Sequence, residues 1–268
     1  MLVLLSPAKS LDFESPLPIR KHTEPRLLEQ SRQLIEVMRG KSASEIASLM
    51  HISDELAALN AQRYADFDPP FTMRNARAAV LAFAGDVYQG MAVRQRWDAR
   101  DYTEAQKTVR TLSGLYGVLR PLDLMQPYRL EMGLPIATDR GANLYQFWGA
   151  RITHLLQADL EQSPGAPVLV NLASDEYARS VDFDAFDRPA ISPRFEDTNT
   201  RGTRSVVSFF AKRARGAMAS WLVRERVRTP GTIRRFAEDG YRYDRAASSP
   251  DRPVFVRRFE DRPTMADR

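Results

Sequence analysis

Cysteine is absent from this chain of 268 residues, and histidine occurs only three times. Without cysteine there is no disulfide, no thiolate nucleophile and no cysteine-ligated metal or iron–sulfur site. The histidines, His22, His51 and His154, are not spaced to place two of them on one helical face. Only carboxylates remain for a hard cation, and no EF-hand-like loop is present. We therefore predict no metal site and no cofactor.

Long apolar runs are also missing. No segment approaches the roughly 18 apolar residues that a membrane span needs. The first nine residues, MLVLLSPAK, lack the basic start and long apolar region of a signal peptide. Residues 85–90, GDVYQG, lack the glycine-rich cradle and Gly-Lys-Ser/Thr ending of a phosphate loop. These absences predict a cytoplasmic protein without a membrane partner, and they argue against an ATPase.

The charge of the chain is uneven. Residues 201–268 carry a net charge of +9, whereas residues 1–200 carry a net charge of −4. A basic block of this kind favours a polyanionic partner, most commonly nucleic acid. Only five of the 39 basic residues are lysine, and a GC-rich coding sequence alone also produces such an arginine bias. Ordinary surface charge is therefore the alternative explanation.

Short apolar runs alternate with amphipathic stretches along the chain. The runs predict strands at residues 2–5, 167–172 and 254–256. The run at 78–83 is either a strand or a buried helix, and the Gly85-Asp86 that follows it favours a strand. Apolar periodicity and capping residues predict helices at 26–38, a pair within 42–64, and further helices at 103–111, 143–160 and 205–227. The alternation predicts an α/β fold (an α+β mixed sheet). We expect one compact domain over residues 1–268, with a central mixed sheet flanked by helices and a disordered tail at 261–268.

In residues 110–133, apolar and charged residues are more closely mixed than elsewhere in the sequence. Charged residues stand there among leucines, two glycines and two prolines, namely Arg120, Asp123, Arg129 and Glu131. Charges within an apolar run must be paired or face a cleft, because burying an isolated ion costs several kcal/mol. The block therefore predicts either a wall of a functional site or an internal ion-pair network that only stabilises the fold.

Polar side chains follow three of the apolar runs. In an open α/β sheet, ligands bind beyond the carboxyl ends of the strands. If the runs are parallel neighbours, one pocket collects Ser6, Lys9, Asp86, Asn171, Ser174 and Glu176. Asp86, Glu131 and Glu176 are then candidate acid/base groups for chemistry on a base or sugar. The alternative is that strand ends are polar only because they meet solvent.

Two segments are candidates for phosphate binding. Residues 112–118 resemble the hairpin of helix-hairpin-helix modules, whose backbone amides contact phosphate, although Gly114 and Gly117 are three apart rather than two. A tight turn between core elements explains these glycines equally well. The predicted helix at 205–227 carries Lys212, Arg213 and Arg215 beside Gly216, which suggests a close backbone approach at that point. Its alternative role is a solvated basic face.

Several motifs in one order resemble the bacterial peroxide stress protein YaaA family. They include LLSPAK at residues 4–9, GDVY at 85–88, residues 112–123, PYRLEMG at 127–133, LYQFW at 144–148, NLASDEY at 171–177 and AKRARGAM at 211–218. The likeness spans residues 1–258. It implies a cytosolic, peroxide-induced, DNA-binding protein that limits free iron and Fenton damage, with a mixed α/β fold, a positively charged cleft and a helix-hairpin-helix element.

Two hypotheses follow. The first is a stress protein that grips double-stranded or structured DNA through Lys9, Gly114, Gly117, Arg120, Arg129, Lys212, Arg213 and Arg215. The second is an enzyme acting on a nucleotide or nucleobase, with Asp86, Glu131 or Glu176 as acid/base and Lys9 or Arg129 holding an anionic group. No activity is established by these residues, and direct iron sequestration is disfavoured by the lack of cysteine.

Overall fold

The computed structural model describes residues 1–263. Its central sheet has five strands in the order β4-β3-β1-β6-β7, where β1 is Leu2–Leu5. The other members are β3 (Val109–Ser113), β4 (Gly117–Leu119), β6 (Leu169–Asn171) and β7 (Ala190–Ile191). β1 runs parallel to β3 and β6, whereas β4 is antiparallel to β3. The predicted mixed α/β fold with a central mixed sheet is confirmed.

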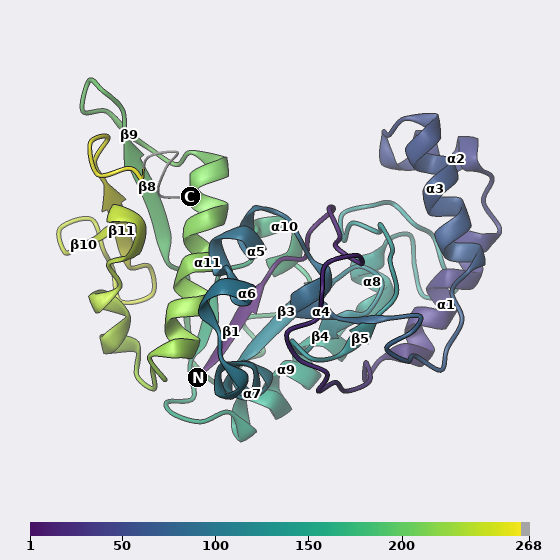
Figure 1. Cartoon of the computed structure of the whole chain (residues 1–268), viewed down its shortest axis with the longest axis horizontal. Helices are drawn as coiled ribbons and strands as arrows, with labels where there is room; N and C mark the ends of the chain where they lie inside the picture. The colour runs from purple at the N-terminus through teal and green to yellow at the C-terminus, as the bar shows by residue number, and fades with distance from the viewer. Residues whose placement is uncertain (264–268) are drawn as a thin grey trace.

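A second sheet has four strands in the order β10-β11-β8-β9. It is built from β8 (Arg194–Thr198), β9 (Arg204–Ser205), β10 (Arg242–Asp244) and β11 (Val254–Arg257). Helix α11 (Ser208–Arg224) lies between this sheet and the central one, and α1 (Leu28–Arg39), α2 (Ala43–Met50) and α3 (Asp54–Ala65) lie at the far end of the molecule (Figure 1). A capping box of Ser42 and Glu45 opens α2.

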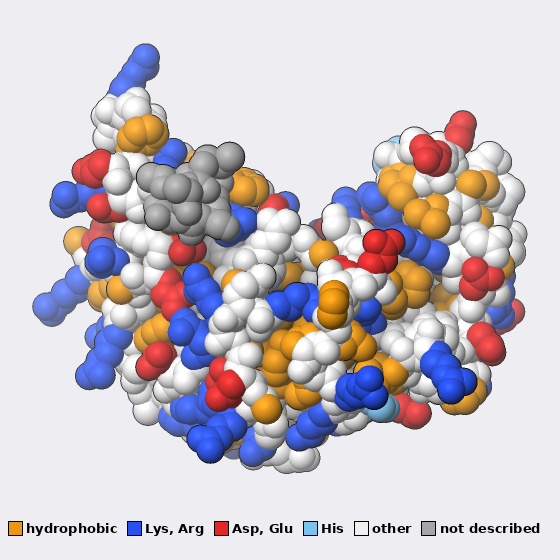
Figure 2. All heavy atoms as spheres, in the orientation of Figure 1, with side chains coloured by type: hydrophobic (Ala, Val, Ile, Leu, Met, Phe, Trp, Pro, Cys, Tyr) orange, Lys and Arg blue, Asp and Glu red, His pale blue; other side chains and the backbone are white. Residues whose placement is uncertain are grey.

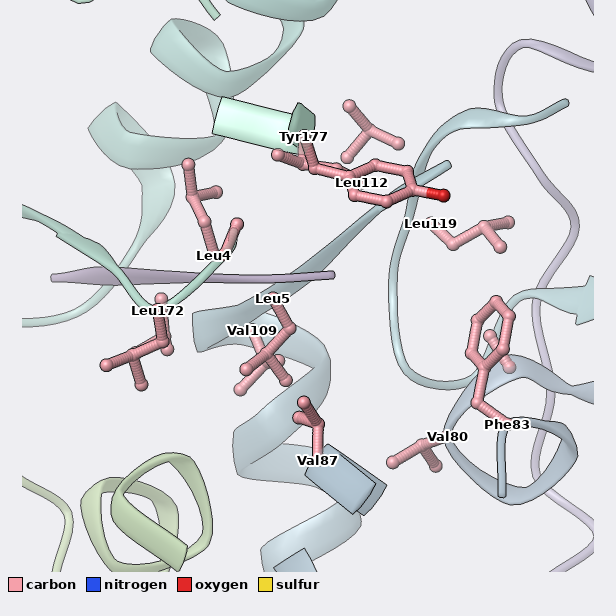
Figure 3. Packing of buried hydrophobic residues seen from close by; sticks show 14 of the residues in the cluster. Leu4, Leu5, Val80, Phe83, Val87, Val109, Leu112, Leu119, Leu172 and Tyr177 are labelled. Carbon is pink, nitrogen blue, oxygen red and sulfur yellow. The ribbon is translucent and has the colours of Figure 1, made fainter. Parts of the chain in front are cut away.

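The core surrounds β1. All four of its residues are buried, as expected for a central parallel strand with both faces covered. Figure 3 shows Leu4 and Leu5 among side chains from α5 (Asp86–Met91), β3 and the residue after β6, Leu172. The remaining elements are α6 (Val93–Arg96), α7 (Ala99–Thr108), α8 (Leu144–Trp148), α9 (Arg151–Gln162), α10 (Asp175–Ala178), η1 (Pro230–Arg235) and η2 (Glu238–Gly240).

Three predicted elements differ from the structure. The run at 78–83, predicted as a strand, forms only the end of β2 (Arg77–Ala78, paired with β5, Leu124–Met125) and then one helical turn, α4 (Ala79–Ala82). The helix predicted at 103–111 starts earlier, at the Asp98 cap, and ends at Thr108 because the following residues pair with β1 as β3. The helix predicted at 143–160 is broken by Gly149, whose φ is +50°.

The segment at 112–118 is a β-hairpin between β3 and β4, so the helical hairpin predicted there is wrong. Both glycines are buried and have packing roles. A Cβ on Gly114 would lie 2.2 Å from the carbonyl oxygen of Leu130, and Gly117, with φ at +67°, lies against the Trp148 ring. The neighbours of the two glycines, Leu130, Leu27 and Trp148, enclose the turn.

The tail prediction is partly wrong. Residues 261–263 are placed against the protein, since Arg262 pairs with Asp197 and stacks over the Phe210 ring at 4.8 Å. Residues 264–268 lie outside the described part of the chain.

Candidate functional site

A cavity of about 360 Å³ lies beyond the carboxyl end of β1. Its wall is built from the loop after β1, the start of α5, residues 128–131, α10 and α11. β1 and β6 are parallel neighbours, so the loops that follow them meet at the same edge of the sheet. The sequence-based expectation of a strand-end pocket therefore corresponds to a real concavity.

Nine of the predicted site residues line this one cavity: Ser6, Lys9, Asp86, Arg129, Glu131, Ser174, Glu176, Lys212 and Arg215. They come from five segments that are distant in the sequence. Asp86 arrives there from the first turn of α5 rather than from a third strand end, because the run before it is helical.

Other predicted residues lie elsewhere. Asn171 turns into its own loop, where its Oδ1 accepts from the Ala173 amide at 3.0 Å, and it does not line the cavity. Arg120 pairs with the fully buried Asp123 at 2.8 Å, which is the internal ion-pair role. Arg213 donates to Gln89 at 3.0 Å and lines a separate cavity of about 470 Å³ between α5, α6 and α11.

Glu131 is the most contacted acid of the site. Its Oε1 lies 3.0 Å from Lys9 Nζ and 3.2 Å from Arg129 Nη2. Its Oε2 is buried and has no hydrogen-bond partner among the described residues. Lys9 and Arg129, proposed from the sequence to hold an anion, thus share one carboxylate, which offsets one of their two charges.

The backbone around Glu131 is held from two sides. The carbonyl oxygen of Leu130 fits against the bare Gly114, so the segment can lie directly on the β3–β4 hairpin. The hydroxyl of Tyr64, on α3, donates to the Arg129 carbonyl oxygen. This packing places Arg129 and Glu131 at the cavity independently of their own ion pair.

Ser6, Ser174 and Glu176 join the loops after β1 and β6. Ser6 Oγ accepts from the Ser174 amide at 2.8 Å and donates to Ser174 Oγ at 3.2 Å. Glu176 Oε1 accepts from the Gly133 amide at 3.1 Å, and Tyr145 donates to the Glu176 carbonyl oxygen at 2.9 Å. These contacts give the three side chains positioning roles within the wall.

Helix α11 supplies two cations of the cavity wall that have no acidic partner. Neither Lys212 nor Arg215 has a carboxylate within 4.0 Å among residues 1–263. Burial lowers the pKa of the Arg215 guanidinium, and the more distant Asp175 acts in the opposite direction. Figure 2 shows a hollow between the end of the molecule with β8 and β9 and the end with α2 and α3, with Lys and Arg side chains along its sides.

The position of α11 depends on two glycines. A Cβ on Gly216 would lie 1.7 Å from the Val87 carbonyl oxygen, and one on Gly90 would lie 2.0 Å from that of Arg213. The expectation of a close backbone approach at Gly216 is confirmed. The contact brings the basic turn of α11 to the same cavity as Asp86 of α5.

Two aromatic residues of the wall were not predicted, Tyr128 and Tyr177. Both rings are buried, and burial raises the pKa of each hydroxyl well above its usual value. Their position in the sequence could have indicated them, because Tyr128 directly precedes Arg129 and Tyr177 directly follows Glu176.

Within residues 1–263, no group of three or more His, Asp or Glu side chains is placed to hold a metal ion. Over the same range, no helix combines the length and apolar character that a bilayer crossing requires.

The fold and the cavity define a mixed α/β protein with a multiply charged strand-end site. A family model described as peroxide stress protein YaaA matches residues 1–247. The chain is 51% identical over 263 residues to a UPF0246 protein of Cupriavidus pinatubonensis, covering 97% of this chain and 100% of that protein. A UPF0246 protein of Delftia acidovorans is 51% identical with the same coverage, and one of Burkholderia cenocepacia is 50% identical over 96% of this chain and 99% of its own. The chain belongs to the peroxide stress protein YaaA family.

Proposed function

We propose that this protein acts in the peroxide stress response in the cytoplasm by binding double-stranded or structured DNA, and so restrains damage from free iron. The family description supports the peroxide stress part. The observation that carries DNA binding is the pair of α11 cations, Lys212 and Arg215, which share a cavity wall and have no acidic partner within 4.0 Å in the described residues.

Phosphate is the group that such a pair suits. A guanidinium offers a planar fork of donors that matches phosphate oxygens, and an ammonium adds a point charge. Burial without a nearby carboxylate leaves the Arg215 charge poorly compensated, so an incoming anion gains more there than at a solvated surface arginine. Lys9 and Arg129 contribute less in this scheme, because Glu131 already pairs with both.

The test compares variants that lose the same charge. Titration of a labelled duplex at one fixed salt concentration should show at least tenfold weaker binding by Lys212→Ala/Arg215→Ala than by the natural protein. Arg234→Ala/Arg235→Ala on η1 removes two exposed arginines outside the cavity and should bind normally. Arg213→Ala alone should have a small effect, because that side chain contacts Gln89.

Equal losses in both double variants would mean that net charge rather than this site governs the affinity. Unchanged binding by correctly folded Lys212→Ala/Arg215→Ala would overturn the proposal.

A further inference from the structure

Exposed apolar side chains gather at the end of the molecule that carries β8 and β9 (Figure 1). Three of the four large apolar side chains that are exposed in residues 1–263 lie there, namely Val206 (44% exposed), Phe209 (41%) and Phe259 (45%). Val206 and Phe209 follow β9, and the Phe259 amide donates to Thr198 Oγ1 of β8 at 2.9 Å. Single exposed apolar side chains are common, but a group of them on one surface marks a site that a partner covers.

An arginine holds two phenylalanine rings of this group. The Cζ atom of Arg262 lies 4.8 Å from the ring centroids of both Phe210 and Phe259. Arg262 is itself fixed, because it pairs with the buried Asp197 at 3.4 Å and donates to the Thr198 carbonyl oxygen at 2.8 Å. The exposed Phe259 ring is therefore ordered before a partner arrives, which reduces the entropy that binding costs.

Phe209 connects these rings to the cations of α11. Its ring centroid lies 5.5 Å from that of Phe210 and 5.8 Å from the Cζ atom of Arg213. Lys212 stands three residues after Phe209, so the two side chains share one face of the helix. A partner that is held at Lys212 therefore also meets the Phe209 ring. We call the following residues the Phe–Arg surface: Phe209, Phe210, Arg213, Phe259 and Arg262.

A groove of about 460 Å³ lies between Phe259 and the turn that joins β8 to β9. Its volume falls within the roughly 300–1,000 Å³ of small-molecule sites, which is enough for one base. Besides the ring it offers the exposed Arg258 for a phosphate and the Glu260 carboxylate as an acceptor for a base N–H. The turn adds further polar groups, from Thr198, Asn199 and Thr200.

We propose that the Phe–Arg surface binds unpaired nucleotides of a DNA strand, with bases stacked on Phe209 and Phe259. Exposed aromatic rings beside arginines are the usual platform for unpaired bases, and every base has a face that stacks. The cations next to the rings, Lys212 and Arg258, favour a polyanionic strand over an apolar protein surface. The inference rests on the proposed DNA binding and specifies the preferred DNA as a duplex interrupted by unpaired nucleotides.

The primary test is titration of the full-length protein with three labelled DNAs of equal length. The first is fully paired, the second contains a gap of about six unpaired thymidines, and the third has abasic sites in the same gap. The intact gap should bind at least tenfold more tightly than the abasic gap, because both carry the same phosphates and only one carries bases. Equal affinity for the two gapped DNAs would overturn the inference, and this comparison needs no variant.

Phe209→Leu/Phe259→Leu then assigns the preference to this surface. Leucine keeps the apolar bulk and removes the aromatic face, so the preference for the intact gap should fall at least tenfold. The affinity for the paired duplex and its salt dependence should not change, because stacking releases no counterions. Phe209→Trp/Phe259→Trp should retain the preference. Tyr243→Leu is the matched control, since Tyr243 has its own arginine over the ring, Arg234 at 5.7 Å, and lies outside this surface.

The remaining outcomes separate this inference from the proposed function. Normal binding of the paired duplex without any preference for bases would overturn the inference alone. A preference for bases that persists when Lys212→Ala/Arg215→Ala binds every DNA normally would overturn the α11 phosphate site and support the stacking surface. If sedimentation showed that the leucine variant loses self-association and keeps its preference for bases, the surface would belong to a second copy of the chain and the inference would be wrong.

Discussion

Asp12 fixes the loop that carries Lys9 to the cavity. Its Oδ1 accepts from the amides of Glu14 and Ser15 at 3.0 and 2.9 Å, and its carboxylate pairs with Arg94 at 3.0 Å and with the buried Arg77 at 3.5 Å. Burial alone would raise the pKa of Asp12, but these amides and Arg94 outweigh it and lower the pKa from 3.8 to about 2. The folded state therefore favours the ionised carboxylate.

This shift predicts a pH-dependent cost for Asp12→Asn. A depressed carboxyl pKa contributes stability that is present above the unfolded value and is lost as the pH falls from about 4 to about 2. At about 1.4 kcal/mol per unit, the variant should be less stable by about 2 kcal/mol at pH 7 and pH 5. Urea unfolding at pH 7, 5, 4 and 3 measures the difference, which should narrow below pH 4. If the free energies of unfolding of the two proteins differed by the same amount at every pH, the lowered pKa of Asp12 would be contradicted.

At the level of single site residues, the strand-end rule found most of the cavity wall. Ser6, Lys9, Ser174 and Glu176 were predictable because they follow β1 and β6, whose apolar runs are plain in the sequence. The pairing of Glu131 with Lys9 was not predictable, since it joins residues 122 positions apart. Nor did the sequence reveal that the Asn171 oxygen is used by its own loop.

At the scale of elements, the contact between α5 and α11 decides where the basic turn lies. Gly216→Ala should destabilise the protein by about 2–3 kcal/mol, because the added methyl meets the Val87 carbonyl oxygen and forces the helices apart. Helix propensity alone predicts the opposite sign, since alanine is favoured over glycine by about 1 kcal/mol within a helix. Chemical unfolding gives the sign directly.

Gly231→Ala is the control for that measurement. Gly231 lies in η1 with open space where a Cβ would stand. It should change the free energy of unfolding by less than about 0.5 kcal/mol. A stabilised Gly216→Ala variant would show that the two helices do not depend on this contact.

The type of an element was predictable where the apolar pattern was long or the helix was capped, as for α11 and α2. The prediction failed where pairing with a segment distant in the sequence determined the element type. The apolar run at 78–83 is compatible with a strand or a buried helix. Pairing with β5 ends at Ala78, and the alanine-rich residues that follow form the helical turn α4. Residues 109–111 belong to the predicted helix at 103–111, yet they pair with β1 as part of β3. The glycines at 114 and 117 likewise mark a β-turn because β4 folds back on β3.

Over the whole molecule, part of the positive charge of the last quarter is paired with acids from the rest of the chain. Arg226 pairs with Asp101 at 2.7 Å and Arg228 with Glu104 at 2.6 Å, both on α7. The block of +9 is therefore in part a structural feature, which the sequence alone could not distinguish from a ligand-binding surface. Lys212 and Arg215 are outside this pairing.

The internal pairs should affect stability and not DNA binding. Arg226→Ala/Arg228→Ala leaves two largely buried carboxylates unpaired, so it should lower the free energy of unfolding by about 1–3 kcal/mol. Thermal and urea unfolding measure this loss. Duplex affinity at a temperature where the variant is folded should stay unchanged, and a large drop there would place these arginines at the DNA.

The most direct test of the central claim, that the α11 cations hold phosphates, is the salt dependence of duplex affinity. A plot of log affinity against log salt loses about 0.9 in slope for each phosphate contact removed. Lys212→Ala/Arg215→Ala should therefore flatten the slope by about two, while Arg226→Ala/Arg228→Ala, with the same charge removed, should keep the natural slope. Equal slopes in all three proteins would contradict the account.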